Sequence, residues 1–160
     1  MRTVNDTEVS RWRVLFFCLL MLKASVGLTA SDVYEVSNVK SAFIFKFIQY
    51  ADWPNEGSLT SFDIGYYGEN KVYFQSLLKM QGRKVRNFKL NVKKVTSLTR
   101  SKALQLLVID ENKSNSLARI VETLRNNPVL LVSDHAKDKK NTMLNFVSTK
   151  QNTLTFELNR

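Results

Sequence analysis

The sequence predicts an α/β fold, in which a mixed, mostly parallel sheet carries helices on both faces and ends in a C-terminal β-hairpin. Three observations predict it. Strand-like and helix-like segments alternate after residue 50. Two segments, Leu104–Ile109 and Val129–Val132, are apolar at every position except Gln105, which is typical of central strands covered on both faces. Two further short strands flank Ser148–Asn152, which has the spacing and the polar residues of a hairpin turn.

The first element is a helix over 31–50 that is unusually apolar. Ser31 or Asp32 can cap its start, and Trp53-Pro54 ends it, because the residue before proline is pushed out of the α region. Five large apolar residues recur on one face at helical spacing: Val36, Val39, Phe43, Phe47 and Tyr50. Since the apolar surface extends further around the helix than one sheet face can cover, we expect part of it to contact another chain, as in a homodimer.

The middle of the chain alternates between the two periods. A strand over 62–67 precedes a helix over 72–80, whose buried residues we expect to be Val72, Phe74, Leu77 and Leu78, with Gly82 at its end. From Val85 to Val95 the period changes to two, which predicts one half-exposed strand with a basic outer face.

The last third continues this alternation. A helix follows the first apolar strand, because Leu117, Ile120, Val121 and Leu124 keep the i, i+3, i+4, i+7 spacing. After the second apolar strand and the loop 133–141, the hairpin strands are expected over 143–147 and 153–158.

The first thirty residues have the pattern of a secretory signal peptide. Arg11 and Arg13 precede the apolar run Val14–Leu22, and small residues follow Lys23. The run is too short to span a bilayer as a helix. We therefore expect residues 1–30 to be a signal peptide and residues 31–160 to form one exported domain, with an uncleaved signal anchor as the alternative.

The composition restricts the function of the expected domain. Residues 1–30 carry four basic and two acidic residues, so their removal lowers the net charge from +10 to +8. For an exported protein such a charge favours anionic envelope material, an acidic partner or lipid head groups over nucleic acid. Cys18, the single cysteine, lies inside the expected signal peptide, so the domain would have neither a disulfide nor a thiol nucleophile.

Two motifs were weighed as catalytic or binding sites. Gly65-x-x-Gly68 lies between a strand and a helix, but the first glycine of the dinucleotide fingerprint is missing, so an ordinary turn is favoured over a phosphate cradle. Ser133-Asp134-His135 contains the residue types of a hydrolytic triad, yet adjacent residues do not normally converge as a triad does. A solvated loop histidine is favoured, and no catalytic, cofactor-binding or metal-binding residue is predicted.

The basic residues of 83–94 are the strongest surface feature. They favour either an edge strand protected by lysines or an anion-binding face centred on Arg86, Lys89 and Lys93. The second interpretation gives an alternative function, which is a binding protein for anionic envelope polymers or lipid head groups.

Several segments together resemble the YfiR-like family. The run Lys40–Phe47 followed by Ala51-Asp52-Trp53-Pro54 is similar to the opening helix of that family. Further matches follow in the same order as in the family: residues 62–68, 104–109, 129–134, 144–147 and 154–159. The resemblance covers nearly the whole of residues 31–160. One departure is Lys140-Asn141-Thr142-Met143, where relatives usually have a Gly-Gly pair.

The resemblance implies a periplasmic α/β domain without enzymatic activity, often dimeric. Family members repress or sense by binding the periplasmic part of an inner-membrane diguanylate cyclase, or they precede membrane sensor kinases. For this chain the resemblance implies a non-enzymatic regulator in cyclic di-GMP signalling, without cofactor. We expect Phe43, Phe47, Tyr50 and Trp53 to contact the partner or a second copy.

Overall fold

The computed structural model describes residues 30–54, 56–149 and 153–159, so the expected signal peptide lies outside them except for Ala30. The helices are α2 (Ala30–Tyr50), α3 (Lys71–Leu78) and α4 (Leu117–Leu124). Among the described residues no helix combines the length and the apolar character needed to cross a membrane.

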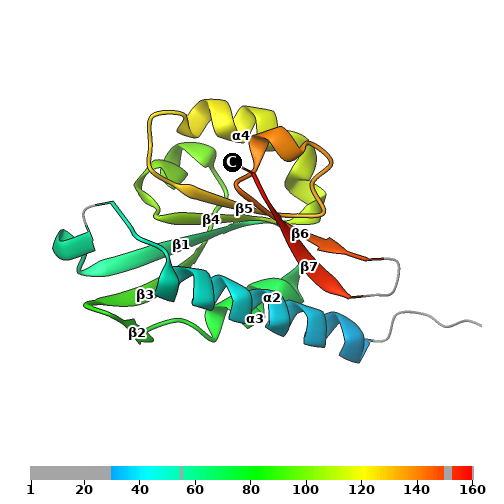
Figure 1. Cartoon of the computed structure of the whole chain (residues 1–160), viewed down its shortest axis with the longest axis horizontal. Helices are drawn as coiled ribbons and strands as arrows, with labels where there is room; N and C mark the ends of the chain where they lie inside the picture. The colour runs from blue at the N-terminus through cyan, green and yellow to red at the C-terminus, as the bar shows by residue number, and fades with distance from the viewer. Residues whose placement is uncertain (1–29, 55, 150–152, 160) are drawn as a thin grey trace, which may run out of the picture. The chain divides into compact units, whose positions relative to one another are not determined.

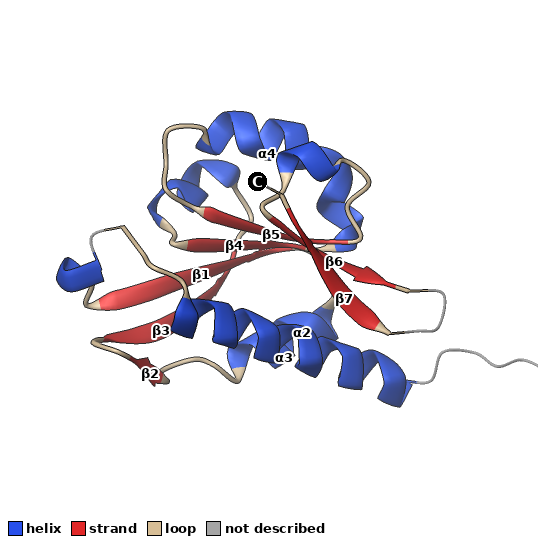
Figure 2. Cartoon of the chain, in the orientation of Figure 1, coloured by secondary structure: helices blue, strands red, loops and turns tan. Residues whose placement is uncertain are grey.

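Seven strands form one sheet in the order β2-β3-β1-β4-β5-β6-β7 (Figures 1 and 2). The five central strands run parallel, whereas β2 pairs antiparallel with β3, and β7 pairs antiparallel with β6. The strand bounds are β1 Ser61–Tyr67, β2 Lys84–Val85, β3 Phe88–Lys94, β4 Leu106–Ile109, β5 Leu130–Asp134, β6 Leu144–Ser148 and β7 Leu154–Leu158. The mixed, mostly parallel sheet with its C-terminal hairpin confirms the predicted fold class.

The helices cover the two faces of the sheet unequally. Buried side chains of α2 and α3, among them Ile44, Ile48 and Leu77, pack on one face together with Leu106 and Val108 of β4. The opposite face of β4 packs against α4 in a second apolar cluster. Because successive side chains of a strand point to opposite faces, a strand that is buried on both must be continuously apolar, as 106–109 is.

Two predictions about the middle of the chain were wrong. The strand expected over 85–95 is a hairpin, in which β2 and β3 flank the turn Arg86-Asn87. Arg86 has φ of +50°, a conformation that arginine rarely adopts, so the usual Gly signal of such a turn is absent. In α3 the buried side chains are Tyr73, Ser76 and Leu77. Of the four residues expected to be buried, only Leu77 is, while Val72, Phe74 and Leu78 are half-buried. Because α3 packs against both the sheet and α2, that packing sets which side of α3 faces inward.

Candidate functional site

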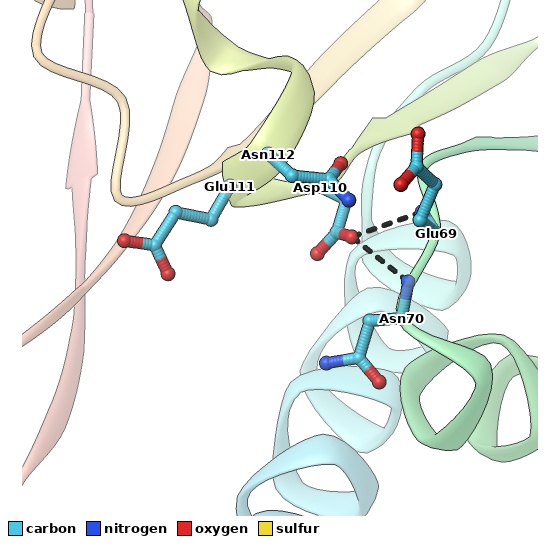
Figure 3. A pocket seen from close by; sticks show the side chains of 5 residues that line it. All are labelled: Glu69, Asn70, Asp110, Glu111 and Asn112. Atoms are coloured by element: carbon cyan, nitrogen blue, oxygen red, sulfur yellow. Dashed lines mark hydrogen bonds between the residues drawn. The ribbon is translucent and has the colours of Figure 1, made fainter.

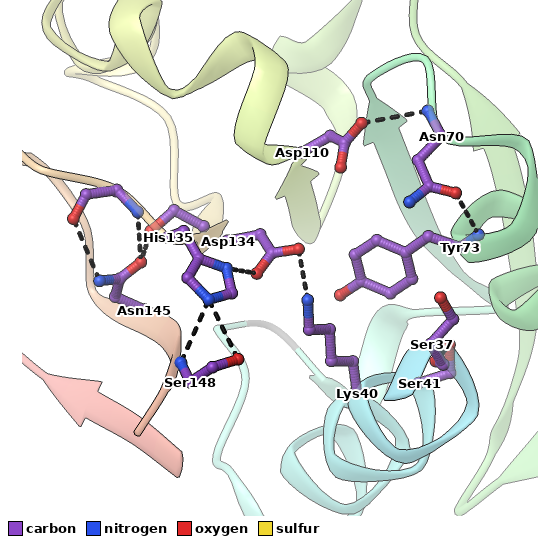
Figure 4. A network of polar contacts seen from close by, with 12 residues as sticks. Ser37, Lys40, Ser41, Asn70, Tyr73, Asp110, Asp134, His135, Asn145 and Ser148 are labelled. Atoms are coloured by element: carbon purple, nitrogen blue, oxygen red, sulfur yellow. Dashed lines mark hydrogen bonds and ion pairs between the residues drawn. The ribbon is translucent and has the colours of Figure 1, made fainter. Parts of the chain in front are cut away.

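Polar side chains gather where the parallel strands β1, β4 and β5 end (Figure 4). The Nζ atom of Lys40 on α2 lies 2.5 Å from Oδ2 of Asp134, the last residue of β5. The two side chains are 9% and 7% exposed, so the ion pair is nearly dry. It joins α2 to the centre of the sheet.

His135 extends this pair toward the surface. Its Nδ1 lies 2.7 Å from Oδ1 of Asp134, and its Nε2 accepts the backbone N–H of Ser148 at 3.1 Å. Because Nε2 is an acceptor in that bond, the neutral ring carries its proton on Nδ1 and donates it to Asp134. His135 also has φ of +49°. The single histidine is thus held by both nitrogens, unlike the solvated loop residue expected from the sequence.

Ser133 does not complete a hydrolytic triad with these residues. Its hydroxyl is 2.7 Å from that of Thr142 and donates to Oδ1 of Asn145 at 2.9 Å. The partners of His135 are instead Asp134 and Ser148. A nucleophilic serine needs a hydrogen bond to its base, and Ser133 is bonded to a different set of atoms.

A second carboxylate, that of Asp110, organises the turn between β1 and α3. Its Oδ2 accepts the backbone N–H groups of Glu69 at 3.2 Å and Asn70 at 3.1 Å. A side chain at Gly68 would overlap the Asp110 carboxylate and the Tyr66 hydroxyl, so only glycine fits there. A side chain at Gly65 would likewise meet Leu104 and Val95. Both glycines of the Gly65-x-x-Gly68 motif are therefore explained by close packing.

The same turn borders an open depression of about 580 Å³ (Figure 3). The residues that line it are Glu69, Asn70, Asp110, Glu111 and Asn112. It lies between β1 and β4, where the chain reverses the order in which it adds strands, and open α/β sheets commonly bind ligands at that point. Its carboxylate and carboxamide groups suit hydrogen-bond donors and cations, and they disfavour a phosphate group.

Charges at the rim of this depression are partly neutralised within the chain. Lys113 donates a hydrogen bond to Glu69 at 2.5 Å. That bond lowers the pKa of Glu69 and raises the pKa of Lys113. Within the described part of the chain, no three His, Cys, Asp or Glu side chains come together as metal ligands.

Two buried tyrosines lie between the carboxylates of Asp110 and Asp134. Tyr66 donates its hydroxyl to the carbonyl of Asn70 at 3.1 Å, and its pKa is raised mainly by burial and then by Asp110. The Tyr73 hydroxyl is buried and has no hydrogen-bond partner among the described residues. Burial, reinforced by Asp134, raises the pKa of Tyr73 well above its ordinary value. Both phenols are therefore neutral at physiological pH.

Sequence reasoning missed this polar cluster, although one signal was available. Lys40 precedes Ile44 and Ile48 at intervals of four, so it lies on the face of α2 that the two buried isoleucines share. A lysine on a buried face needs a carboxylate, and Asp134 lies two residues after the apolar run Val129–Val132. The pairing itself could not be predicted, because the two residues are 94 positions apart.

The predicted contact residues fall into two groups. Phe43 and Tyr50 are 36% and 78% exposed, and the rings of Phe43 and Phe47 lie 5.8 and 5.4 Å from that of Phe156 on β7. Trp53 instead packs on the core. Its ring lies 4.6 Å from that of Phe62, and its indole N–H donates to the carbonyl of Ile48 at 3.2 Å.

The basic residues proposed for anion binding are largely engaged inside the domain. Arg86 forms an ion pair with Glu56 and donates to the carbonyls of Gln49 and Ala51 at the end of α2. Lys93 lies 2.5 Å from Asp63. Lys89 is exposed on the outer face of β3. Arg86 and Lys93 thus neutralise carboxylates of this chain, which weakens the case for an anion-binding face.

Comparison with known proteins identifies one family. The sequence model described as YfiR/HmsC-like matches residues 37–160, which is more than half of the chain. No curated protein matches. A solved structure of YbdL from Escherichia coli, described as having a methionine aminotransferase function, is 6% identical, with a TM-score of 0.34. That match covers 54% of this chain and 31% of the YbdL chain, and so small a likeness supports no conclusion about activity.

Proposed function

This chain belongs to the YfiR/HmsC-like family, and from that premise we propose that it is an exported regulator that binds the periplasmic part of an inner-membrane diguanylate cyclase. The protein would repress the cyclase and so lower cyclic di-GMP. The family match over residues 37–160 is the observation that carries this proposal, because the family is regulatory. Export is supported by the pattern of a signal peptide in the first thirty residues.

The surface of α2 supports a role in protein binding. Val36, Val39, Phe43 and Tyr50 are all large, apolar and exposed. Their spacing of three, four and seven places them on one stripe of the helix, which we call the α2 stripe. Contiguous exposed apolar residues of this kind mark contacts between proteins. We propose that the α2 stripe contacts the cyclase or a second copy of the chain.

The polar cluster supports the same interpretation from the other side of the helix. Lys40 anchors α2 through Asp134, which His135 in turn connects to β6. These residues bond to one another and hold the contact helix in place. They therefore serve the architecture of a binding module.

Deleting the gene tests the regulatory proposal. We expect cyclic di-GMP, measured by mass spectrometry of cell extracts, to rise severalfold in the deletion strain and to fall back when the wild-type gene is restored. The variant Phe43→Glu should not restore the low level, because it places a charge in the α2 stripe. The control Arg119→Glu, an exposed position on α4, should restore it. An unchanged cyclic di-GMP level after deletion would overturn the proposal.

Export has its own test. Alkaline phosphatase is active only outside the cytoplasm, so a fusion after Arg160 should be active. The same fusion without residues 1–30 should be inactive. Equal activity of the two fusions would contradict the proposed location.

A further inference from the structure

The exposed large apolar side chains of the described residues lie on neighbouring elements. Besides the α2 stripe they are Met143, directly before β6, and Phe156 and Leu158 of β7. Phe156 packs against Phe43 and Phe47, so β7 and the α2 stripe form one continuous apolar surface. In Figure 1, α2 runs alongside the β6-β7 end of the sheet. This surface is where a partner would gain most from burial.

The backbone of β7 is also open for pairing. Among the described residues, β7 is the last strand of the sheet and pairs with β6 alone. Asn159 N–H donates to Met143, and Thr149 N–H donates to Thr153, so the odd-numbered residues of β7 make the hydrogen bonds to β6. The N–H and C=O groups of Leu154, Phe156 and Leu158 therefore point away from β6, along the free edge.

The opposite edge of the sheet is protected, whereas β7 is not. β2 contains only Lys84 and Val85, and a short, basic strand is a common defence against edge pairing. β7 contains five residues, Leu-Thr-Phe-Glu-Leu, without lysine or proline. It is the longer and more apolar of the two edges, and thus the one suited to accept another strand.

We infer that β7 pairs antiparallel with β7 of a second copy about a two-fold axis at Phe156, so that the two sheets become one. This inference deepens the proposed function, because it assigns the α2 stripe to a second copy. In this register Leu154 lies opposite Leu158 of the second copy, and Thr155 lies opposite Glu157. Apolar residues face apolar ones on the α2 side, polar residues face polar ones on the other side, and no glutamate meets a glutamate.

The geometry of the strand and of the helix fits this register. A two-fold axis at Phe156 joins the outward N–H and C=O groups of Leu154, Phe156 and Leu158 in about six hydrogen bonds between the copies. Ile44 and Ile48 of α2 are buried in the core, whereas Phe43 reaches out to Phe156. Phe43 also lies 6.4 Å from Phe146 of β6, so the helix packs over β6 and β7 of its own copy. The two α2 stripes would then pack together.

The purified chain should have the mass of a dimer in sedimentation equilibrium at micromolar concentration. Leu158→Pro removes an outward N–H that β6 does not use, and Leu158→Ala keeps it. We expect the proline variant to weaken the dimer at least tenfold with an unchanged urea midpoint, and the alanine variant to weaken it less. Ala118→Lys on α4 is the control and should leave the dimer intact.

A cysteine scan tests the register, in a chain in which Cys18 is replaced by serine. At the axis, paired Cα atoms of the two copies are about 5.5 Å apart, which permits a disulfide. Phe156→Cys should therefore form a disulfide-linked dimer under mild oxidation. Leu154→Cys should not, since the two cysteines would be about 13 Å apart along the strands.

Three outcomes would overturn the inference. These are a monomer at all concentrations up to 100 µM, a dimer that Leu158→Pro does not weaken, and cross-linking at position 154 instead of 156. If β7 instead binds a strand of the membrane partner, the purified chain will be a monomer, which also contradicts the inference. All of the measurements use the purified chain alone, so such a result would leave the cyclic di-GMP experiment as a separate test of the proposed function.

Discussion

Replacing Lys40 with methionine tests whether the polar cluster is as dry as the structure shows. Unit charges 2.5 Å apart attract by about 7 kcal/mol at an effective dielectric constant of about 20, an attraction offset by several kcal/mol of desolvation for each ion. Lys40→Met keeps the length of the side chain and leaves Asp134 buried without its cation. We expect the free energy of unfolding to fall by about 3–5 kcal/mol at pH 7.5.

The matched control is Lys93→Met. Lys93 lies at the same 2.5 Å from Asp63, but its side chain is 49% exposed. Exposed ion pairs contribute about 0–1 kcal/mol, so Lys93→Met should change stability by no more than that. Urea denaturation followed by tryptophan fluorescence measures both variants, since Trp53 packs on the core beside Phe62.

A loss below about 1 kcal/mol at pH 7.5, equal to that of Lys93→Met, would show that water solvates Asp134 and would refute the reasoning.

Three further predictions follow from the buried tyrosines and from Gly68. Tyr73→Phe removes a buried hydroxyl that has no partner among the described residues, so it should raise the free energy of unfolding by about 1 kcal/mol. Tyr66→Phe loses a hydrogen bond and should lower the free energy of unfolding by a similar amount. If urea titrations show that Tyr73→Phe is destabilised, a water molecule satisfies the hydroxyl. The pKa values of Tyr66 and Tyr73 are raised in the folded state, so the unfolded chain loses these protons first as pH rises past about 10. The free energy of unfolding should therefore fall between about pH 9 and 11, and it should fall less steeply in Tyr73→Phe. A flat profile would argue against burial of the phenols. Gly68→Ala should cost about 1–3 kcal/mol by overlap with Asp110, while Gly57→Ala, which meets no atom within 4 Å, should be nearly neutral in thermal unfolding; equal effects of the two variants would contradict the packing argument.

Local sequence patterns predicted most of the fold because, in most elements, the spacing of the apolar residues matches the positions that are buried. The apolar runs at β4 and β5 and the period of α4 gave elements that the structure confirms within a few residues. The prediction missed the β2-β3 turn because the residue with positive φ is Arg86 instead of glycine. The prediction of the buried residues of α3 failed because both the sheet and helix α2 contact this helix. Local periodicity does not show which of two neighbours buries a given side chain.

The candidate site was predicted less well, for a physical reason. The motifs that attracted attention, Gly65-x-x-Gly68 and Ser133-Asp134-His135, are local in sequence, and the structure explains the glycines by packing. The ion pair between Lys40 and Asp134 joins two ends of the chain. A charged residue that is buried on one element needs a partner of opposite charge, but the sequence does not show which residue that partner is.

The sequence by itself determined the class of the fold, the family and the apolar character of α2, because these depend on hydrophobic periodicity and on ordered motifs along the chain. The tertiary structure alone decided which side of α2 stays exposed, which strand edge is open, and which carboxylate receives Lys40. Those features depend on how the strands order themselves across the sheet, since that order brings β1, β4 and β5 together in its centre and leaves β7 as an outer strand.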